Sequence, residues 1–237
     1  MMNPRTQYFC AWCGVAFVVL FTLGWWIIAS YVPPLSPTLT AAEVADFYQR
    51  NTGSIRFGLM PTMISAALTA PWVAVIAVQM KRIEGEFPVL TYAQLVAGAV
   101  GIVVLLLPPL IWTTVAFRVD RDPQLMQLMN DFAWLLFIMT FSPAFIQNLV
   151  IGLAIFSDRN TTPVFPRWLG YFNIWVAILF VPGGLITFFK TGPFAWNGLL
   201  AFWVPLVIFF AWFLVMFVAL LKSIREQKAA LQKTVPV

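Results

Sequence analysis

The sequence predicts an all-α, polytopic membrane protein, with six transmembrane helices and a short extracytoplasmic interfacial helix in a single membrane domain over residues 1–237. Hydrophobic residues make up 61% of the chain and charged residues only 10%, which is too apolar for an ordinary soluble domain. Six apolar runs each reach the roughly 20 residues that a helix needs to cross a bilayer. Open sheet would leave backbone groups unpaired in lipid, and the alternating pattern of a membrane β-barrel is absent.

The predicted transmembrane helices cover, in chain order, residues 8–32, 57–80, 93–117, 132–156, 168–189 and 197–221. The first run is too long for the core of a cleaved signal peptide, so we expect the protein to retain it. The connections at 81–91 and 157–167 have the length of ordinary helix-to-helix links and contain no glycine-rich phosphate loop. Nucleotide-driven transport by this chain alone is therefore excluded.

The first outer loop predicts a short helix at about 41–50. Thr40 and Glu43 have the Thr-x-x-Glu spacing of a capping box, and Gly53 is placed to end the helix as a left-handed cap. The apolar positions are Val44, Phe47 and Tyr48, and the polar positions are Asp46, Gln49 and Arg50. So short a helix is unstable alone, so we expect it to lie on the lipid interface or on the ends of the other helices.

Two further signals concern how the helices start and bend. Asp122 followed by Pro123 predicts that the fourth helix begins about ten residues before it enters the membrane. Prolines inside helices remove a backbone donor and favour kinks. Pro61, Pro108, Pro109, Pro182 and Pro205 lie toward the outer ends of their helices, whereas Pro71 and Pro143 lie closer to mid-bilayer. We therefore expect the helices to splay in the outer half and to leave a cavity under the outer loops.

The distribution of Lys and Arg predicts the orientation, because positively charged loops stay in the cytoplasm. With the amino terminus inside, nine basic residues lie inside: Arg5, Lys81, Arg82, Arg159, Arg167, Lys222, Arg225, Lys228 and Lys233. The remaining five of the 14 lie outside. We expect an inner (plasma) membrane protein with both termini cytoplasmic, and a basic tail at 222–237 that meets anionic head groups. The basic pI thus gives no argument for nucleic-acid binding.

Composition also limits the chemistry. The chain has no histidine, which removes haem ligation and most metal sites, so neither a metal nor a cofactor is predicted. Cys10 and Cys13 form a CxxC spacing, but the cytosol is reducing, so small apolar helix residues are the favoured interpretation over a redox pair. No Asp, Glu, Lys or Arg lies well inside a predicted span, which argues against ion- or proton-coupled transport.

The candidate site residues fall into two groups. The ligand-binding candidates lie at the outer face and are Glu43, Asp46, Tyr48, Arg56, Arg118, Asp131, Trp112 and Trp196. Pairs such as Arg56 with Asp131, or Arg118 with Glu43, would lock the loops together or bind a polar head group. Asn148 and Asn173 reach similar depths in neighbouring helices, and an interhelical hydrogen bond is favoured over ligand binding for them.

The tryptophans are expected at two depths. Trp12, Trp168, Trp112, Trp134 and Trp196 fit the interfacial aromatic belts. Trp72, Trp175, Trp203 and Trp212 lie deeper, where they line a cavity or face lipid.

Two stretches carry a resemblance: "PPLSPTLTAAEVADFYQRNTGSIRFG" after the first helix and "FPRWLGYFNIW" at the start of the fifth. Together they resemble uncharacterised bacterial integral-membrane proteins of about this length. The resemblance implies a bacterial origin and an inner-membrane location, and it assigns no site residues.

Three functions fit these observations, and the sequence does not identify a catalytic residue. The favoured one is binding or passage of a lipophilic molecule at an outer-half cavity without ion coupling. The alternative is a non-catalytic subunit whose outer loops dock on another membrane protein. The third is an intramembrane isomerase or cyclase that uses Glu43, Asp46 or Asp131 as a general acid. The expected partners are therefore the lipid bilayer and a lipophilic ligand or a membrane protein.

Overall fold

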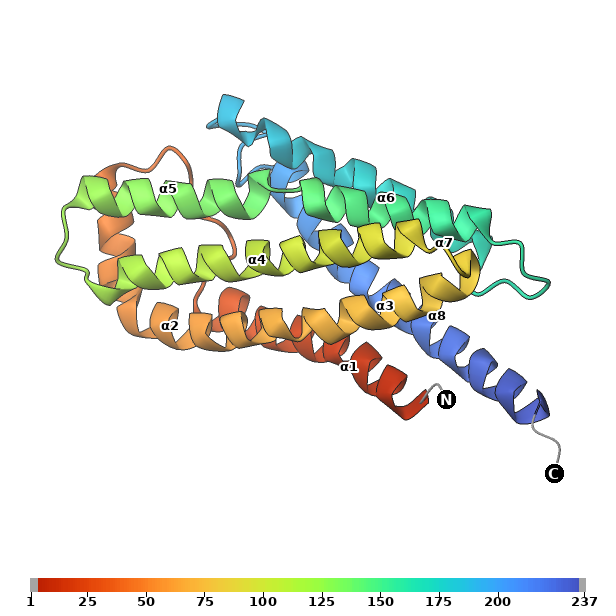
Figure 1. Cartoon of the computed structure of the whole chain (residues 1–237). Helices are drawn as coiled ribbons and strands as arrows, with labels where there is room; N and C mark the ends of the chain where they lie inside the picture. Colours follow the sequence, from red (N-terminus) through yellow and green to blue (C-terminus); the bar gives the residue numbers. More distant parts are fainter. Residues whose placement is uncertain (1–3, 235–237) are drawn as a thin grey trace.

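The computed structural model describes residues 4–234, and all of its regular elements are helices (Figure 1). The elements are α1 (Pro4–Phe21), η1 (Thr22–Ile28), α2 (Ala41–Ala67), α3 (Thr69–Glu84), α4 (Val89–Phe117), α5 (Pro123–Met139), α6 (Ser142–Ser157), α7 (Arg167–Phe180), η2 (Val181–Phe188), η3 (Leu199–Trp203) and α8 (Val204–Thr234). They form six stretches that are long and apolar enough to cross a membrane. The predicted number of transmembrane segments is confirmed. Residues 1–3 and 235–237 of the predicted domain and tail lie outside the described residues.

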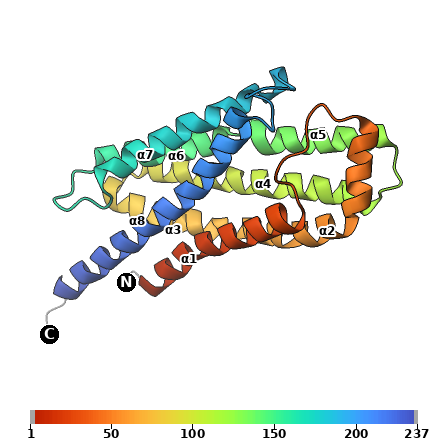
Figure 2. The same ribbon diagram turned by 180° about the vertical axis from the view of Figure 1, so that it is seen from behind.

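The six stretches form one bundle. We call the end where α1 begins and α8 ends the terminal end, and the opposite end, with residues 29–40 and 118–122, the loop end (Figures 1 and 2). Two stretches consist of two helices laid end to end, α2 with α3 and α5 with α6 (Figure 1). A third changes from the α-helix α7 to the 3-10 helix η2. The bundle is thus continuous along some spans and broken within others.

α2 begins as predicted but does not end as predicted. The Thr40 backbone N–H donates to Glu43 Oε2 at 2.7 Å, and the Glu43 N–H donates to Thr40 Oγ1 at 3.4 Å, so the capping box is formed. The helix then continues past Gly53 to Ala67, which makes the predicted cap at Gly53 wrong. Residues 41–50 are the first turns of α2, and they run across the loop end before the helix enters the bundle (Figures 1 and 2).

The first turns of α2 lie on the ends of other helices. Val44, Ala45 and Tyr48 are buried, and the Tyr48 hydroxyl donates to Asn130 Oδ1 of α5 at 3.0 Å. α5 begins where the sequence predicts, because Asp122 accepts hydrogen bonds from the first turn with proline next in the chain. The apolar face of these turns therefore packs against α5.

At the terminal end, side chains from three helices form a buried polar network. Gln79 Nε2 of α3 donates to Gln7 Oε1 of α1 at 2.5 Å and to Gln227 Oε1 of α8 at 3.2 Å. Arg82 Nη1 donates to Gln79 Oε1 at 2.5 Å and to Ser223 Oγ at 3.0 Å. Buried polar groups need such partners, so this network fixes α1, α3 and α8 to one another.

Candidate functional site

Three helix breaks surround one point of the bundle, and each has a proline close by. α2 gives way to α3 at Leu68, shortly before Pro71. α5 gives way to α6 at Thr140 and Phe141, before Pro143, and η2 contains Pro182. Because proline has no N–H and clashes with the preceding turn, it favours a break on its amino-terminal side. Pro61, Pro108 and Pro109 lie inside uninterrupted α2 and α4, so proline alone does not place the breaks.

Residues from all three breaks line one cavity of about 170 Å³. Thr69 lines it from the first break, Thr140 and Phe141 from the second, and Gly183 from the third. Broken helices are tolerated at membrane depth where they line a cavity or are buried in protein. A dry apolar cavity of about 150 Å³ is large enough to hold benzene. The cavity therefore has the size for a small apolar molecule or for part of a longer one.

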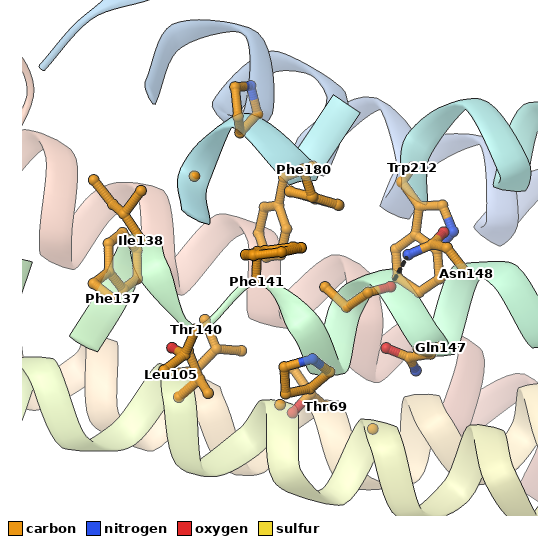
Figure 3. A pocket seen from close by; sticks show the side chains of 18 of the residues that line it. Thr69, Leu105, Phe137, Ile138, Thr140, Phe141, Gln147, Asn148, Phe180 and Trp212 are labelled. Carbon is orange, nitrogen blue, oxygen red and sulfur yellow. Dashed lines mark hydrogen bonds between the residues drawn. The ribbon is translucent and has the colours of Figure 1, made fainter. Parts of the chain in front are cut away.

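The cavity has an apolar end and a polar end. In Figure 3, Phe137, Ile138 and Leu105 lie at one end, and Gln147 and Asn148 lie at the other beside Trp212. None of the described residues that line the cavity carries a charge. An uncharged, mostly apolar lining favours a neutral lipophile over an ion.

Asn148 and Asn173 differ sharply in their hydrogen bonding. Asn173 Oδ1 accepts from Trp212 Nε1 at 2.9 Å, and Asn173 Nδ2 donates to the Leu169 carbonyl at 2.8 Å. Asn148 Nδ2 donates to the Ala144 carbonyl at 2.9 Å, but Asn148 Oδ1 has no partner among the described residues. The predicted interhelical bond thus exists for Asn173, with Trp212 as its partner, and the two asparagines do not bond to each other.

Two more polar atoms of the lining lack partners within residues 4–234. They are Gln147 Nε2 and Trp72 Nε1. The Gln147 amide lies against Gly98 of α4, where an added Cβ would come within 3.0 Å of Nε2. Because Gly98 has no side chain, it leaves space for the Gln147 amide.

A groove on the outside of the bundle shares one lining residue with the cavity. It runs between α4 and α6 and is lined by Tyr92, Val96, Val100 and Ile146, all of them exposed. Pro143 lines both the groove and the cavity. Both helices belong to membrane-spanning stretches, so the groove opens sideways toward lipid.

The ligand-binding candidates from the sequence do not line this cavity. Glu43 is held in the capping box, and Asp46 pairs with Arg50 at 2.7 Å. Asp131 Oδ1 accepts from Asn130 Nδ2 at 3.4 Å, and Trp196 Nε1 donates to the Leu35 carbonyl at 2.7 Å. Each of these four side chains has a local role at the loop end.

Arg56 and Arg118 share a partner that the sequence analysis did not name. Both guanidinium groups lie 5.9 Å from the ring centroid of Phe117. The predicted ion pairs with Asp131 and Glu43 are absent from the described residues. Two exposed arginines thus flank one exposed aromatic ring at the end of α4.

An aromatic box fills the space where the sequence analysis placed the cavity. It consists of Trp25, Tyr31, Trp112 and Trp134, all fully buried. The ring centroids of Tyr31 and Trp112 lie 4.4 Å apart, and those of Trp112 and Trp134 lie 4.9 Å apart. The expectation that Trp112 and Trp134 lie in an interfacial belt is therefore wrong, because they are packed inside the protein.

Of the last two candidates, Trp112 belongs to this box and Tyr48 touches it. The Tyr31 hydroxyl donates to the Tyr48 hydroxyl at 3.3 Å. Burial raises the pKa of Tyr31 well above its ordinary value, and Tyr48 adds to the effect, so Tyr31 keeps the proton that it donates. The box and its tyrosines are therefore a neutral structural unit.

Sequence reasoning missed the polar end of the cavity as a site. The sequence favours an interhelical hydrogen bond for Asn148 and does not place Gln147 in a site. The available signal was that Gln147 and Asn148 are adjacent polar residues in an otherwise apolar span. Cys10 and Cys13 are both free thiols, away from the cavity lining.

Comparison of the chain with protein-family models, curated proteins and solved structures finds no match in any of the three. The function must therefore be argued from the site.

Proposed function

We propose that this protein binds a neutral lipophilic molecule in the cavity at the three helix breaks and exchanges it with the bilayer through the groove between α4 and α6. The observation that carries the proposal is the cavity itself, which is apolar, uncharged and bordered by broken helices. Ligand sites are typically concave and mostly apolar with a few placed polar groups. The lack of a charged lining residue favours binding or passage without ion coupling.

The same proposal includes the location of the protein. We place it in a bacterial plasma membrane on the basis of the resemblance that two of its stretches carry, and we place both ends of the chain in the cytoplasm on the basis of the nine-to-five distribution of basic residues. The loop end is then the extracytoplasmic face, and the first turns of α2 form the helix at its interface.

Native mass spectrometry of the protein, released from its own membrane in mild detergent, tests the proposal. We expect a bound mass of a few hundred daltons or less, in the range of small lipophiles. A stoichiometric protein partner without such a ligand would instead support the alternative of a non-catalytic subunit. We favour the intramembrane enzyme less, because Glu43, Asp46 and Asp131 do not line the cavity.

Arg56 and Arg118 form a second, weaker site for a lipid head group. They flank Phe117 and have no carboxylate partner among the described residues. Guanidinium groups at a membrane surface attract anionic phosphate with about 1 kcal/mol each, which is about fivefold in affinity.

We expect Arg56→Gln with Arg118→Gln to lower the binding of phosphatidylglycerol by more than about tenfold at low salt. Titration of the lipid into the detergent-solubilised protein, read by native mass spectrometry, measures the change. Arg159→Gln, which removes an exposed arginine at the terminal end, is the control. Equal losses for the two variants would show that the arginines act only through net charge.

A further inference from the structure

The polar end of the cavity contains a hydrogen-bond acceptor that the protein leaves unused. Asn148 is 3% exposed, and its Nδ2 bond to the Ala144 carbonyl identifies Oδ1 as the free atom. Leaving a buried acceptor unpaired is costly, and inside a bilayer no bulk water is present to pair it. Proteins retain such a group where something else supplies the donor.

From this we infer that the ligand carries a hydroxyl group, bound by Asn148 Oδ1 and by the N–H donors of Gln147 or Trp72. The inference rests on the proposed function and specifies the ligand class of that same cavity. A hydroxyl is both donor and acceptor, so it offers a partner of the right kind to the free acceptor and to a free donor. An ether or a ketone has no proton for Asn148 Oδ1.

Charged groups fit the site poorly. No described lining residue is acidic or basic, so neither a carboxylate nor an ammonium group would find a counter-ion in a low-dielectric site. A hydrocarbon fits the apolar lining but leaves all three polar atoms unpaired. A lipophilic alcohol therefore matches both ends of the cavity.

The two threonine hydroxyls of the cavity lining are already engaged. The Thr69 hydroxyl donates to the Ala66 carbonyl at 2.5 Å, and the Thr140 hydroxyl donates to the Leu136 carbonyl. The Trp212 indole N–H donates to Asn173 Oδ1, so both of these groups have a partner. The indole N–H groups of the aromatic box also lack partners within residues 4–234, but that box is filled by its own rings. The unpaired buried polar atoms that belong to lining residues of the cavity are thus those of Asn148, Gln147 and Trp72.

The arrangement sets the orientation of the alcohol. Figure 3 places Gln147 and Asn148 at one end of the cavity and Phe137, Ile138 and Leu105 at the other. The hydroxyl therefore lies toward α6 and α8, and the hydrocarbon body extends toward the α5 side of the break.

Photolabelling with two matched probes tests the inference. The probes are a diazirine-bearing octanol and the corresponding diazirine-bearing octane, given at equal amounts per lipid to the full chain in vesicles. Peptide mass spectrometry locates the label. We expect half-maximal labelling of cavity residues at a concentration about tenfold lower for the alcohol than for the alkane. Asn148→Leu should remove this preference.

Stability without ligand supplies a second readout. Asn148→Leu should raise the Tm by about 2–6 °C, because it removes an unpaired buried acceptor. Asn173→Leu, the matched control, should lower the Tm by about 4 °C or more, because it leaves Trp212 Nε1 without its acceptor.

The outcomes distinguish a failure of the hydroxyl inference from a failure of the proposed function. Equal labelling by both probes at the cavity, or a preference that survives in Asn148→Leu, overturns the hydroxyl inference and leaves lipophile binding standing. A fall in Tm for Asn148→Leu also overturns it, since Oδ1 would then be engaged within the protein. Absence of label from the cavity with either probe overturns the proposed function as well.

Discussion

Trp25→Ala is expected to lower the free energy of unfolding by about 3–5 kcal/mol. Trp25 is fully buried, and its ring lies 5.2 Å from that of Phe137 and 6.2 Å from those of Trp134 and Phe202. In a membrane the unfolded helices remain in an apolar solvent, so the loss comes from packing contacts and not from exposure to water. Reversible unfolding in mixed micelles measures the change.

Trp175→Ala is the matched control. Trp175 also lies in a membrane-spanning helix, but it is 62% exposed. We expect its removal to change the free energy of unfolding by no more than about 0.5 kcal/mol. Similar losses for both variants would contradict the conclusion that the aromatic box is the packed core of the loop end.

Gly101→Phe is expected to reduce photolabelling of the cavity by either probe to the background level. Gly101 lines the cavity next to Val100 of the groove, and an added Cβ would meet no atom within 4 Å. A Cβ can therefore be added without a clash, and the phenyl ring is expected to fill space between the cavity and the groove. The free energy of unfolding should change by less than about 1 kcal/mol.

Gly53→Phe provides the comparison for this variant. Gly53 is also helical and also has open space around an added Cβ, but it lies in α2 away from the cavity lining. Labelling of the Gly53→Phe protein should equal that of the unchanged protein. If the cavity in Gly101→Phe is still labelled, the ligand enters by another route.

Local signals in the sequence predicted local structure well. The capping box at Thr40 and the Asp122–Pro123 start of α5 both depend on residues within one helical turn, and both are confirmed. The cap at Gly53 failed because a glycine permits a left-handed turn without requiring one. The helix continues because the residues after Gly53 pack into the bundle, where Ile55, Gly58 and Leu59 are buried.

The site was harder to predict because it depends on contacts between distant residues. The sequence indicates that Trp112 and Trp134 are aromatic, but not that they meet Trp25 and Tyr31 inside the bundle. The network of Gln7, Gln79 and Gln227 joins positions up to 220 residues apart, and no single span shows a reason to expect it. The prolines pointed to irregular helices, but only packing decides which of them become breaks.

The two ends of the bundle are closed by different means, and the cavity lies between them. The aromatic box fills the loop end, and the network around Gln79 ties the terminal end. In the proposed function, the groove between α4 and α6, which shares Pro143 with the cavity lining, is the route of entry from lipid. A ligand that enters there equilibrates with the hydrocarbon phase and with neither aqueous compartment. Its occupancy then follows its mole fraction among the lipids, and a sparingly soluble compound can saturate the protein at a negligible concentration in water.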